Sequence, residues 1–429
     1  MVERRGFLKG SVLGAAGLAL PAMAACSPTP PLDTTGVFTH GVASGDPHAD
    51  SVVLWTRVQV PPTAEPVEVR WSIGTEPTVA GPVASGTTTT DASRDGTVKV
   101  VAGGLTGSTT YYYRFDVAGA ASPIGRTRTA PSGDADRLRF GVASCSNYGY
   151  GNFHAYRHLL RRNDLDAVIH LGDYIYEYAS PGFGETYGEA RNLIPRHEIV
   201  SLDDYRARYG HYRADPDLQE LHRQHPMIHV WDDHEFADDP FVGGAANHQP
   251  SNGDWSARVA AALQAYTEWM PTRIDGNRIF RTLEYGSLAR IIGVDRQRRF
   301  LWPESADAGE YLGREQAAWL DARIAETDSR WLVLAQQTTF GPTAPNLVDG
   351  GWTAADRARV LGAVAATPSD LVVLTGDIHR FHALDVVDDP AAYDPATGAG
   401  SAAVEFAAGS ISSPGSPAAG VGLSMRWNT

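Results

Sequence analysis

A regular alternation of apolar runs and helical patterns between residues 138 and 376 constrains the fold of this chain most. The apolar runs are LRFGVAS (138–144), DAVIHL (166–171), MIHVW (227–231), WLVLAQQ (331–337) and DLVVLTG (370–376). Segments with helical spacing lie at 153–163, 201–224, 255–270, 313–326 and 354–366, and 281–295 resembles a hairpin. Buried strands that alternate with helices predict a layered α/β domain with a largely parallel sheet.

Residues 37–130 follow a different pattern of short alternating segments broken by Gly, Pro, Ser and Asp. Those segments are 51–58, 67–74, 97–104 and 110–119. Their period is that of half-buried antiparallel strands at the spacing of a β-sandwich. GLTGSTTYYYRF (104–115) is similar to fibronectin type III-like modules. A chain of 429 residues is long enough for two domains, so we predict a β-sandwich at 37–130 and an α/β domain at 137–418.

The first 26 residues are typical of an export signal and not of a folded domain. ERRGFLK (3–9) resembles a twin-arginine motif, and the Gly/Ala-rich segment after it is too short to span a membrane stably. MAAC (23–26) resembles a lipobox in which Cys26 would be lipidated. Met stands where Leu is usual, so a cleaved form without lipid remains an alternative. We expect export by the Tat translocase, with the protein periplasmic, secreted or lipid-anchored at the cell envelope, and a Pro/Thr-rich linker at 27–36.

The net charge excludes some classes of binding partner, and the cysteine count singles out Cys145. Lys and Arg total 36 against 50 Asp and Glu, a net charge of −14. This argues against nucleic acid or an anionic membrane surface as the main partner, so contact with a membrane is expected only through a lipid anchor. The chain has 2 cysteines, Cys26 and Cys145. If Cys26 is lipidated, Cys145 is a lone thiol in an exported protein and calls for a role.

Ligand-type side chains follow the five apolar runs. Because ligands bind at the carboxyl ends of strands in α/β domains, we expect these side chains to meet at one edge of one sheet. The candidates are Cys145 and Asn147 after the first run, Asp173 and Tyr176 after the second, Asp233 and His234 after the third, and Asp377 and His379 after the fifth, while the fourth run ends in Gln336 and Gln337.

Each candidate has a structural alternative. An Asp after a strand commonly caps the next helix, and a lone Cys usually packs in a core. Capping accounts for one carboxylate per loop, but not for imidazoles and a thiol at the same edge. Together these side chains predict a metal centre, and a carboxylate shared by two ions about 4 Å apart suits in-line displacement at phosphorus. Thiolate and phenolate beside carboxylates favour a trivalent ion over zinc. The chain contains neither a Walker A motif nor GxSxG.

Several of these motifs resemble the PhoD family of secreted alkaline phosphatase/phosphodiesterases, which are calcineurin-like and purple acid phosphatase-like metallophosphoesterases. The matching segments are FTHGVASGDP (38–47), FGVASCSNY (140–148), HLGDYIYEY (170–178), 203–222, HVWDDHEFADD (229–239) and LTGDIH (374–379). The resemblance implies a β-sandwich followed by an αββα metallophosphoesterase domain. It also implies a mixed-metal site with iron (Fe³⁺) and calcium (Ca²⁺), although another divalent metal could take part.

Roles follow from the resemblance residue by residue. It implies that Asp173 bridges the two ions and that Cys145, Tyr176 and His379 bind iron. Asp233 and Asp377 are then expected to face calcium. His234 is the expected proton donor to the leaving alcohol, for which an ordinary pKa of about 6.5 is suitable. In this sequence DRQRR (295–299) replaces the usual phosphate-binding run, so the expected substrate contacts are Asn147, Arg296 and Arg298.

The end of the chain departs from the family pattern. The family continues beyond EFAAGSISSPGSP (405–417), whereas here 419–429 form an atypical tail with little strand character. We therefore expect the α/β domain to be truncated or altered at its C-terminus.

The sequence thus predicts an exported, monomeric enzyme that hydrolyses phosphate mono- and diesters by a metal-activated hydroxide. Its substrates would be small phosphate esters or a phosphate-containing polymer. Two alternatives remain open at this point. One is a non-catalytic cell-envelope binding protein with a degenerate phosphoesterase domain, and the other is a phospholipase-type activity on the same scaffold.

Overall fold

The computed structural model describes residues 36–60, 65–183, 191–302, 311–341, 351–415 and 425–428. The predicted export signal, Cys26 and nearly all of the linker lie outside these residues. In the part that is described, no helix combines the length and the apolar character needed to cross a bilayer.

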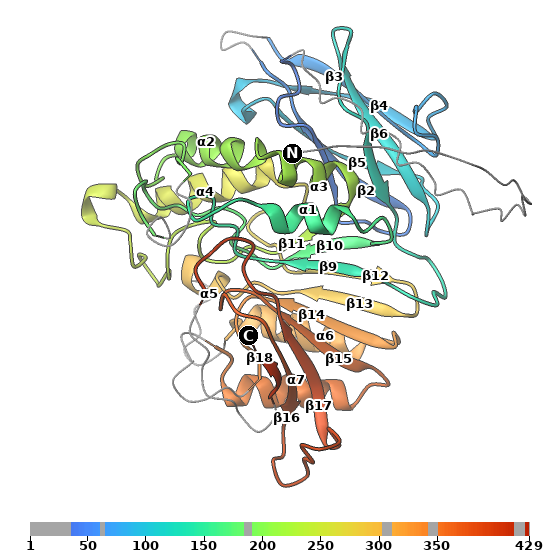
Figure 1. Ribbon diagram of the computed structural model, residues 1–429, viewed down its shortest axis with the longest axis vertical. Helices are drawn as coiled ribbons and strands as arrows, with labels where there is room; N and C mark the ends of the chain where they lie inside the picture. Colours follow the sequence, from blue (N-terminus) through green and yellow to red (C-terminus); the bar gives the residue numbers. More distant parts are fainter. Residues whose placement is uncertain are drawn as a thin grey trace, which may run out of the picture. The chain divides into compact units, whose positions relative to one another are not determined.

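A 6-stranded sheet joins the N-terminal region to the α/β region, in the order β5-β2-β1-β11-β10-β9 (Figure 1). Its strands are β1 (Val42–Gly45), β2 (Ser51–Arg57), β5 (Thr97–Gly103), β9 (Phe140–Ala143), β10 (Ala167–His170) and β11 (Pro226–His229). Strands β9, β10, β11 and β1 run parallel, and β2 and β5 continue the sheet antiparallel. The predicted parallel core is therefore extended on one side by strands from the predicted sandwich.

The N-terminal region is β-rich, as predicted. A second sheet has the order β4-β3-β6-β7, with β8 paired to β6. Its strands are β3 (Val67–Gly74), β4 (Ala84–Thr90), β6 (Thr110–Val117), β7 (Ala120–Ala121) and β8 (Gly125–Arg128), and the short helix η1 (Ala92–Arg94) precedes β5. Alternate residues of the two sheets, among them Val52, Leu54, Val69, Ile73 and Phe115, form one apolar cluster. This alternation is the period of 2 from which the sandwich was predicted.

A 7-stranded sheet of order β12-β13-β14-β15-β17-β16-β18 forms the rest of the α/β region. Its strands are β12 (Arg281–Tyr285), β13 (Ala289–Gly293), β14 (Trp331–Gln336), β15 (Asp370–Thr375), β16 (His382–Val387), β17 (Ser401–Ala407) and β18 (Met425–Asn428). The expectation that all five ligand-bearing strands share one sheet is therefore wrong. A strand inside two stacked sheets is covered on both faces, as it is in one sheet between helices, so its apolar pattern does not distinguish the two arrangements.

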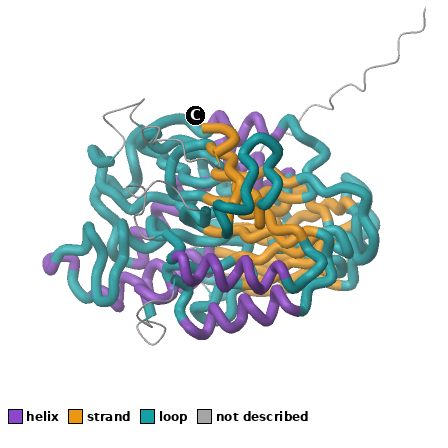
Figure 2. Tube along the Cα trace, turned by 90° about the horizontal axis from the view of Figure 1, so that it is seen from below, coloured by secondary structure: helices purple, strands orange, loops and turns teal. Residues whose placement is uncertain are grey.

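The two sheets pack against each other and carry helices on their outer faces. Ile169, Val230, Ile291 and Val333 belong to the apolar cluster that the two sheets share. Helices α1 (His154–Leu160), α2 (Leu202–Arg213), α3 (Pro216–Gln224) and α4 (Trp255–Trp269) pack on the first sheet, and α6 (Arg314–Ala325) and α7 (Ala354–Ala365) on the second. The short α5 (Arg298–Leu301) and η2 (Pro250–Asn252) lie in connections. Figure 2 shows helices lying against the strand layer. This confirms the predicted αββα layering.

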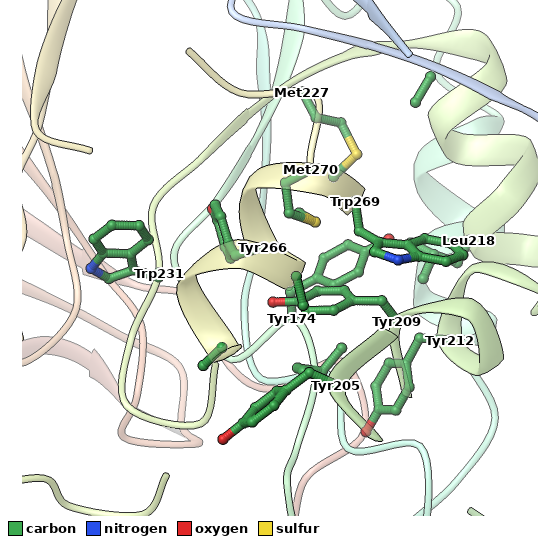
Figure 3. Packing of buried hydrophobic residues seen from close by; sticks show 14 of the residues in the cluster. Tyr174, Tyr205, Tyr209, Tyr212, Leu218, Met227, Trp231, Tyr266, Trp269 and Met270 are labelled. Atoms are coloured by element: carbon green, nitrogen blue, oxygen red, sulfur yellow. The ribbon is translucent and has the colours of Figure 1, made fainter. Parts of the chain in front are cut away.

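Aromatic side chains fill the layer between the first sheet and its helices. Figure 3 shows Tyr205, Tyr209 and Tyr212 of α2 gathered with Tyr266 and Trp269 of α4. All five belong to one buried cluster with strand residues of the first sheet. This layer fixes α2 and α4 behind the loops that follow β10 and β11.

The last described residues form a strand. β18 pairs antiparallel with β16, with His382 opposite Asn428. The prediction of little strand character in the tail is wrong over these residues. Without β18, β16 would be the edge strand of this sheet, and an edge offers backbone N–H and C=O groups to a neighbouring segment whatever the side-chain pattern of that segment.

Candidate metal centre

Four of the predicted ligands lie in unusual backbone conformations directly after strands. The φ angles of Cys145, Asp173, Asp377 and His379 are 59°, 54°, 63° and 49°. Residues other than glycine rarely adopt the left-handed region, and such strain persists mainly where the surroundings fix it, often at active sites. The local backbone thus turns these four side chains out of the direction of their strands.

Gly172 lets two of the loops approach each other. Its φ is 101°, and a Cβ atom at this position would lie 2.8 Å from the backbone nitrogen of Asp232. Only glycine fits so close to a neighbouring backbone. The Gly in the GD pair therefore brings the loop after β10 against the loop after β11.

A first group of candidate ligands combines thiol, carboxylate, imidazole and phenol. One ligand atom each of Cys145, Asp173 and His379 lies within 4.8 Å of the others. The Tyr176 hydroxyl is 3.0 Å from His379 Nε2 and donates to Asp173 Oδ2 at 3.3 Å. Ser413 Oγ donates to the same hydroxyl at 2.7 Å. The structure therefore brings together the four residues predicted to hold iron.

A second group consists of carboxylates. One oxygen each of Asp173, Asp232, Asp233 and Asp377 lies within 4.8 Å of the others, and Asp173 and Asp233 form a similar group with His234. Asp173 is common to all the groups, as expected of a bridging carboxylate. Asp232 was not predicted, although it immediately precedes Asp233 in the WDDHE segment.

The chemistry of these residues fits bound cations. Asp173 Oδ1 and Asp232 Oδ2 are buried without a hydrogen-bond partner among the described residues. Burial raises the pKa of both carboxyls well above the usual value. Burial, together with the Asp173 carboxylate, raises the pKa of the Cys145 thiol and the Tyr176 phenol in the same way. A positive ion would reverse these shifts, because it stabilises each anionic form.

His234 is held by a buried carboxylate, that of Glu177. Glu177 is fully buried, and its Oε2 lies 2.8 Å from His234 Nδ1. Burial acts to lower the pKa of His234, but Asp233, Glu177 and Asp173 outweigh it and hold the pKa well above the usual value. The contact with Glu177 leaves Nε2 as the ring nitrogen that can act on a ligand. Glu177 therefore positions the imidazole of His234.

Glu235 ties the two ligand loops together, a role that the sequence pattern did not indicate. Its carboxylate accepts hydrogen bonds from the backbone N–H groups of Asp173, Tyr174 and Asp232 at 3.1, 2.6 and 2.7 Å. The residue is fully buried. Its place directly after His234 was the available signal, but a chain position cannot show which backbone groups a carboxylate meets.

Arg296 lies across the carboxylate group. Its Nε donates to Asp232 Oδ1 at 2.7 Å, and its Nη2 is 3.5 Å from Asp233 Oδ1 and 3.7 Å from Asp377 Oδ1. Gln297 Nε2 donates to the same Asp232 oxygen at 2.6 Å. Arg296 is thus placed at the site, where it partly neutralises the carboxylates.

The other two predicted substrate contacts, Arg298 and Asn147, bond to residues outside the carboxylate group. Arg298 pairs with Glu315 at 2.9 Å and donates to Asn277 Oδ1 at 3.1 Å, and no described contact joins it to the candidate ligands. Asn147 Nδ2 donates to the backbone oxygen of Phe183 at 3.2 Å. The position of Arg298 does not support a role as a substrate contact. Asn147 instead holds the backbone at Phe183.

Comparison with known proteins gives matches to two family models, one relative and one solved structure. A model of the PhoD-like phosphatase family matches residues 140–423, and a model of the N-terminal domain of PhoD-like phosphatases matches residues 25–131. Alkaline phosphatase D of Bacillus subtilis (strain 168) is 35% identical over 382 residues, which cover 80% of this chain and 64% of that protein. A solved structure described as "Structure of PhoD" matches with a TM-score of 0.78 and 32% identity, covering 89% of this chain and 79% of that chain. The chain therefore spans less than two thirds of the length of the Bacillus relative.

Proposed function

The chain belongs to the PhoD-like phosphatase family, and we propose on this premise that it is an exported, metal-dependent hydrolase of phosphate esters. The observation that carries the proposal is the position of Asp173, which is common to every group of candidate ligands around it. A carboxylate shared in this way suits two ions at a site for displacement at phosphorus.

We assign iron to the group that contains Cys145, Tyr176 and His379, and calcium to the group that contains Asp233 and Asp377, with Asp173 in both. Thiolate, phenolate and imidazole suit a transition metal, whereas a set of carboxylate oxygens suits calcium. When bound, such ions lower the pKa of a water ligand and neutralise the phosphoryl oxygens.

The residues of the chain have distinct tasks in this proposal. Glu177 holds His234 by Nδ1, so His234 keeps a proton at Nε2 for the oxygen of the leaving alcohol. Arg296 fixes the orientation of Asp232 and limits repulsion within the carboxylate group. Glu235 holds the two loops in register through their backbone N–H groups. Substrates are phosphate monoesters, diesters or both.

Export by the Tat translocase is the second part of the proposal. It rests on the ERRGFLK motif and the short Gly/Ala-rich segment after it. Tat export carries folded proteins, which would allow the metal centre to form before translocation. We expect the mature protein to be a monomer.

Substitution at Asp173 tests the metal mechanism. The purified protein should hydrolyse an aryl phosphate monoester or diester, and Asp173→Asn should lower kcat/KM at least about 100-fold, since interactions with the ions supply several kcal/mol. Asp136→Asn, at an exposed position, is the matched control and should keep full activity. A folded Asp173→Asn protein that keeps its activity, also after treatment with a chelator, would contradict the proposal.

Elemental analysis separates the enzyme from the alternative of a binding protein. The enzyme should carry iron and calcium in near-stoichiometric amounts. A folded, monodisperse sample without bound metal and without activity would instead favour a non-catalytic envelope protein.

A further inference from the structure

An exposed aromatic residue lies at the end of a row of rings that starts at His234. The Phe183 side chain is 44% exposed. Its ring centroid is 5.3 Å from that of Tyr178, and Tyr178 is 5.3 Å from the imidazole of His234. Tyr178 and Phe183 therefore lead from the candidate proton donor to the surface.

A buried side chain holds the backbone of Phe183 in place. Asn147 is 1% exposed, and its amide nitrogen donates to the Phe183 carbonyl at 3.2 Å. The turn before Phe183 is tight, because a Cβ atom on Gly182 would lie 2.1 Å from the backbone oxygen of Ala179. Phe183 is thus presented to solvent by a fixed turn.

The geometry around His234 decides which part of a substrate would meet these rings. Tyr176 stacks on the imidazole with 4.1 Å between centroids and an angle of 30°. One nitrogen of His234 lies within 4.8 Å of oxygens of Asp173 and Asp233. An ester oxygen that takes a proton from His234 would lie beside these carboxylates, and Tyr178 and Phe183 are the rings that continue from His234 to the surface.

The surroundings of the two rings favour an uncharged group. Asp238 interacts with Tyr178, and Glu177, which holds His234, also accepts from the backbone N–H of Asp238 at 2.8 Å. A second anionic group on the leaving alcohol would be repelled by these carboxylates. A planar apolar ring is instead attracted to aromatic side chains, by about 0.5–1.5 kcal/mol for a ring pair and about 1–3 kcal/mol for a stacked base.

We propose that Tyr178 and Phe183 form a platform for a planar aromatic ring in the leaving alcohol, so that aryl or nucleoside phosphate esters are preferred over alkyl esters. This inference rests on the proposed hydrolysis at the Asp173 centre and adds a substrate class to it. The shared chemistry is an uncharged planar ring, attached to the ester oxygen directly or through a sugar.

Matched substrates test the platform in the metal-loaded, full-length protein. Phenyl phosphate and hexafluoroisopropyl phosphate have leaving alcohols of similar acidity, but only the first has a ring. Phe183→Ala should lower kcat/KM for phenyl phosphate about 5- to 10-fold and leave the fluoroalkyl ester within about twofold. Phe183→Leu keeps an apolar side chain and should show the same selective loss. Phe406→Ala, which removes a ring that is 46% exposed on β17, should affect neither ester.

Adenosine 5′-monophosphate distinguishes the two sources of the ring. A loss of its hydrolysis in Phe183→Ala that accompanies the loss for phenyl phosphate shows that the platform also takes a ring carried on a sugar. A loss for phenyl phosphate alone places the ring directly on the ester oxygen. Equal losses on all three esters, or no loss on any, would overturn the platform.

A binding measurement separates this inference from the proposed function. Phenylphosphonate should bind wild-type protein more tightly than methylphosphonate by calorimetry, and Phe183→Ala should remove that difference. If the wild type hydrolyses no ester, the proposed function fails, while the phosphonates still decide whether the rings bind an aromatic group. Equal affinity for both phosphonates in the wild type would overturn the platform even in an active enzyme.

Discussion

The β-sandwich region and the α/β region bury different kinds of side chain. The core of the sandwich has Val69, Ile73 and Phe115 at its centre, and apart from Asp46 the polar residues buried in this region are serines and threonines. The α/β region instead buries Arg208, His222 and Glu235 completely. Apolar burial stabilises the first region without direction, whereas the second also depends on specific polar partners, since a buried polar group without one is costly.

Arg208 illustrates the second kind of burial. Its guanidinium donates to the backbone oxygens of Tyr176, Tyr178 and Pro195. One buried side chain thereby holds the loop that carries Tyr176. From this difference we expect substitutions in the sandwich core to lower only the free energy of unfolding. Substitutions in the polar interior should also lower the metal content and the activity.

Removing Glu235 should have the largest effect. Glu235→Ala leaves three buried backbone N–H groups without an acceptor, at about 1–3 kcal/mol each. We expect the free energy of unfolding to fall by at least about 3 kcal/mol and the bound metal to fall with it, as measured by urea denaturation and elemental analysis. The control Glu68→Ala, at an exposed position of β3, should change stability by less than about 0.5 kcal/mol. Full metal content in Glu235→Ala would break the comparison.

A cavity in the sandwich should cost comparable or slightly less stability but leave the metal centre intact. Ile73→Ala removes a fully buried side chain of β3 and should lower the free energy of unfolding by about 2–4 kcal/mol. Metal content and kcat should equal those of the wild type under conditions where the variant is folded. Val83→Ala, at a position 53% exposed, is the control. A loss of metal in Ile73→Ala would show that the two regions are coupled through their shared sheet.

Glu177 should affect the reaction more than the fold. Glu177→Gln weakens the support of His234 and should lower kcat about 10- to 100-fold for an alkyl phosphate. The loss should be much smaller for 4-nitrophenyl phosphate, because its leaving group departs without a proton. Metal content should stay unchanged, and Glu284→Gln on β12 serves as an exposed control. Equal losses on both esters would assign Glu177 a purely structural role.

The buried histidines should lower the stability of the α/β region at acidic pH, and we expect this effect to be smaller than those of the substitutions above. Burial lowers the pKa of His170 to about 3, and burial lowers the pKa of His222 and His229 well below the usual value. An unfolded chain titrates these groups near about 6.5. Below that pH the unfolded state binds more protons at these three positions, so their contribution to stability is constant above about 6.5 and falls as the pH decreases toward the folded pKa values.

Hydrogen exchange can measure the loss of stability at acidic pH separately in the two regions. In metal-loaded protein, in which bound ions would hold Asp173 and Asp232 in their anionic forms, a change from pH 7.5 to 5.5 should reduce protection in β10 and β11 more than in β3 and β6, after correction for intrinsic rates. His222→Gln should reduce this difference, because one of the buried titrating groups is removed. Equal loss of protection in both regions would show that they unfold as one unit.

Much of the fold and of the site could be predicted from the sequence. The period of β6 and the run of residues in β10 show which faces are buried, and HLGDYIYEY and WDDHE place Asp173, Tyr176, Asp233 and His234 at strand ends. Glu177 and Glu235 stand in the same segments but were not assigned a role. Their importance depends on a partner 57 residues away for Glu177 and 62 residues away for Glu235, and only the folded chain brings these partners together.

The sequence by itself determined the order of strands and helices and the types of ligand at the strand ends, because both follow from local periodicity and from residue chemistry. Only the tertiary structure decided that the ligands come from two stacked sheets, that the first of these continues into the sandwich, and that Arg296 lies on three carboxylates. The physical reason is that strand pairing and buried charge pairing join residues far apart in the chain. A local pattern shows that a side chain is buried or charged, but not which distant group it meets.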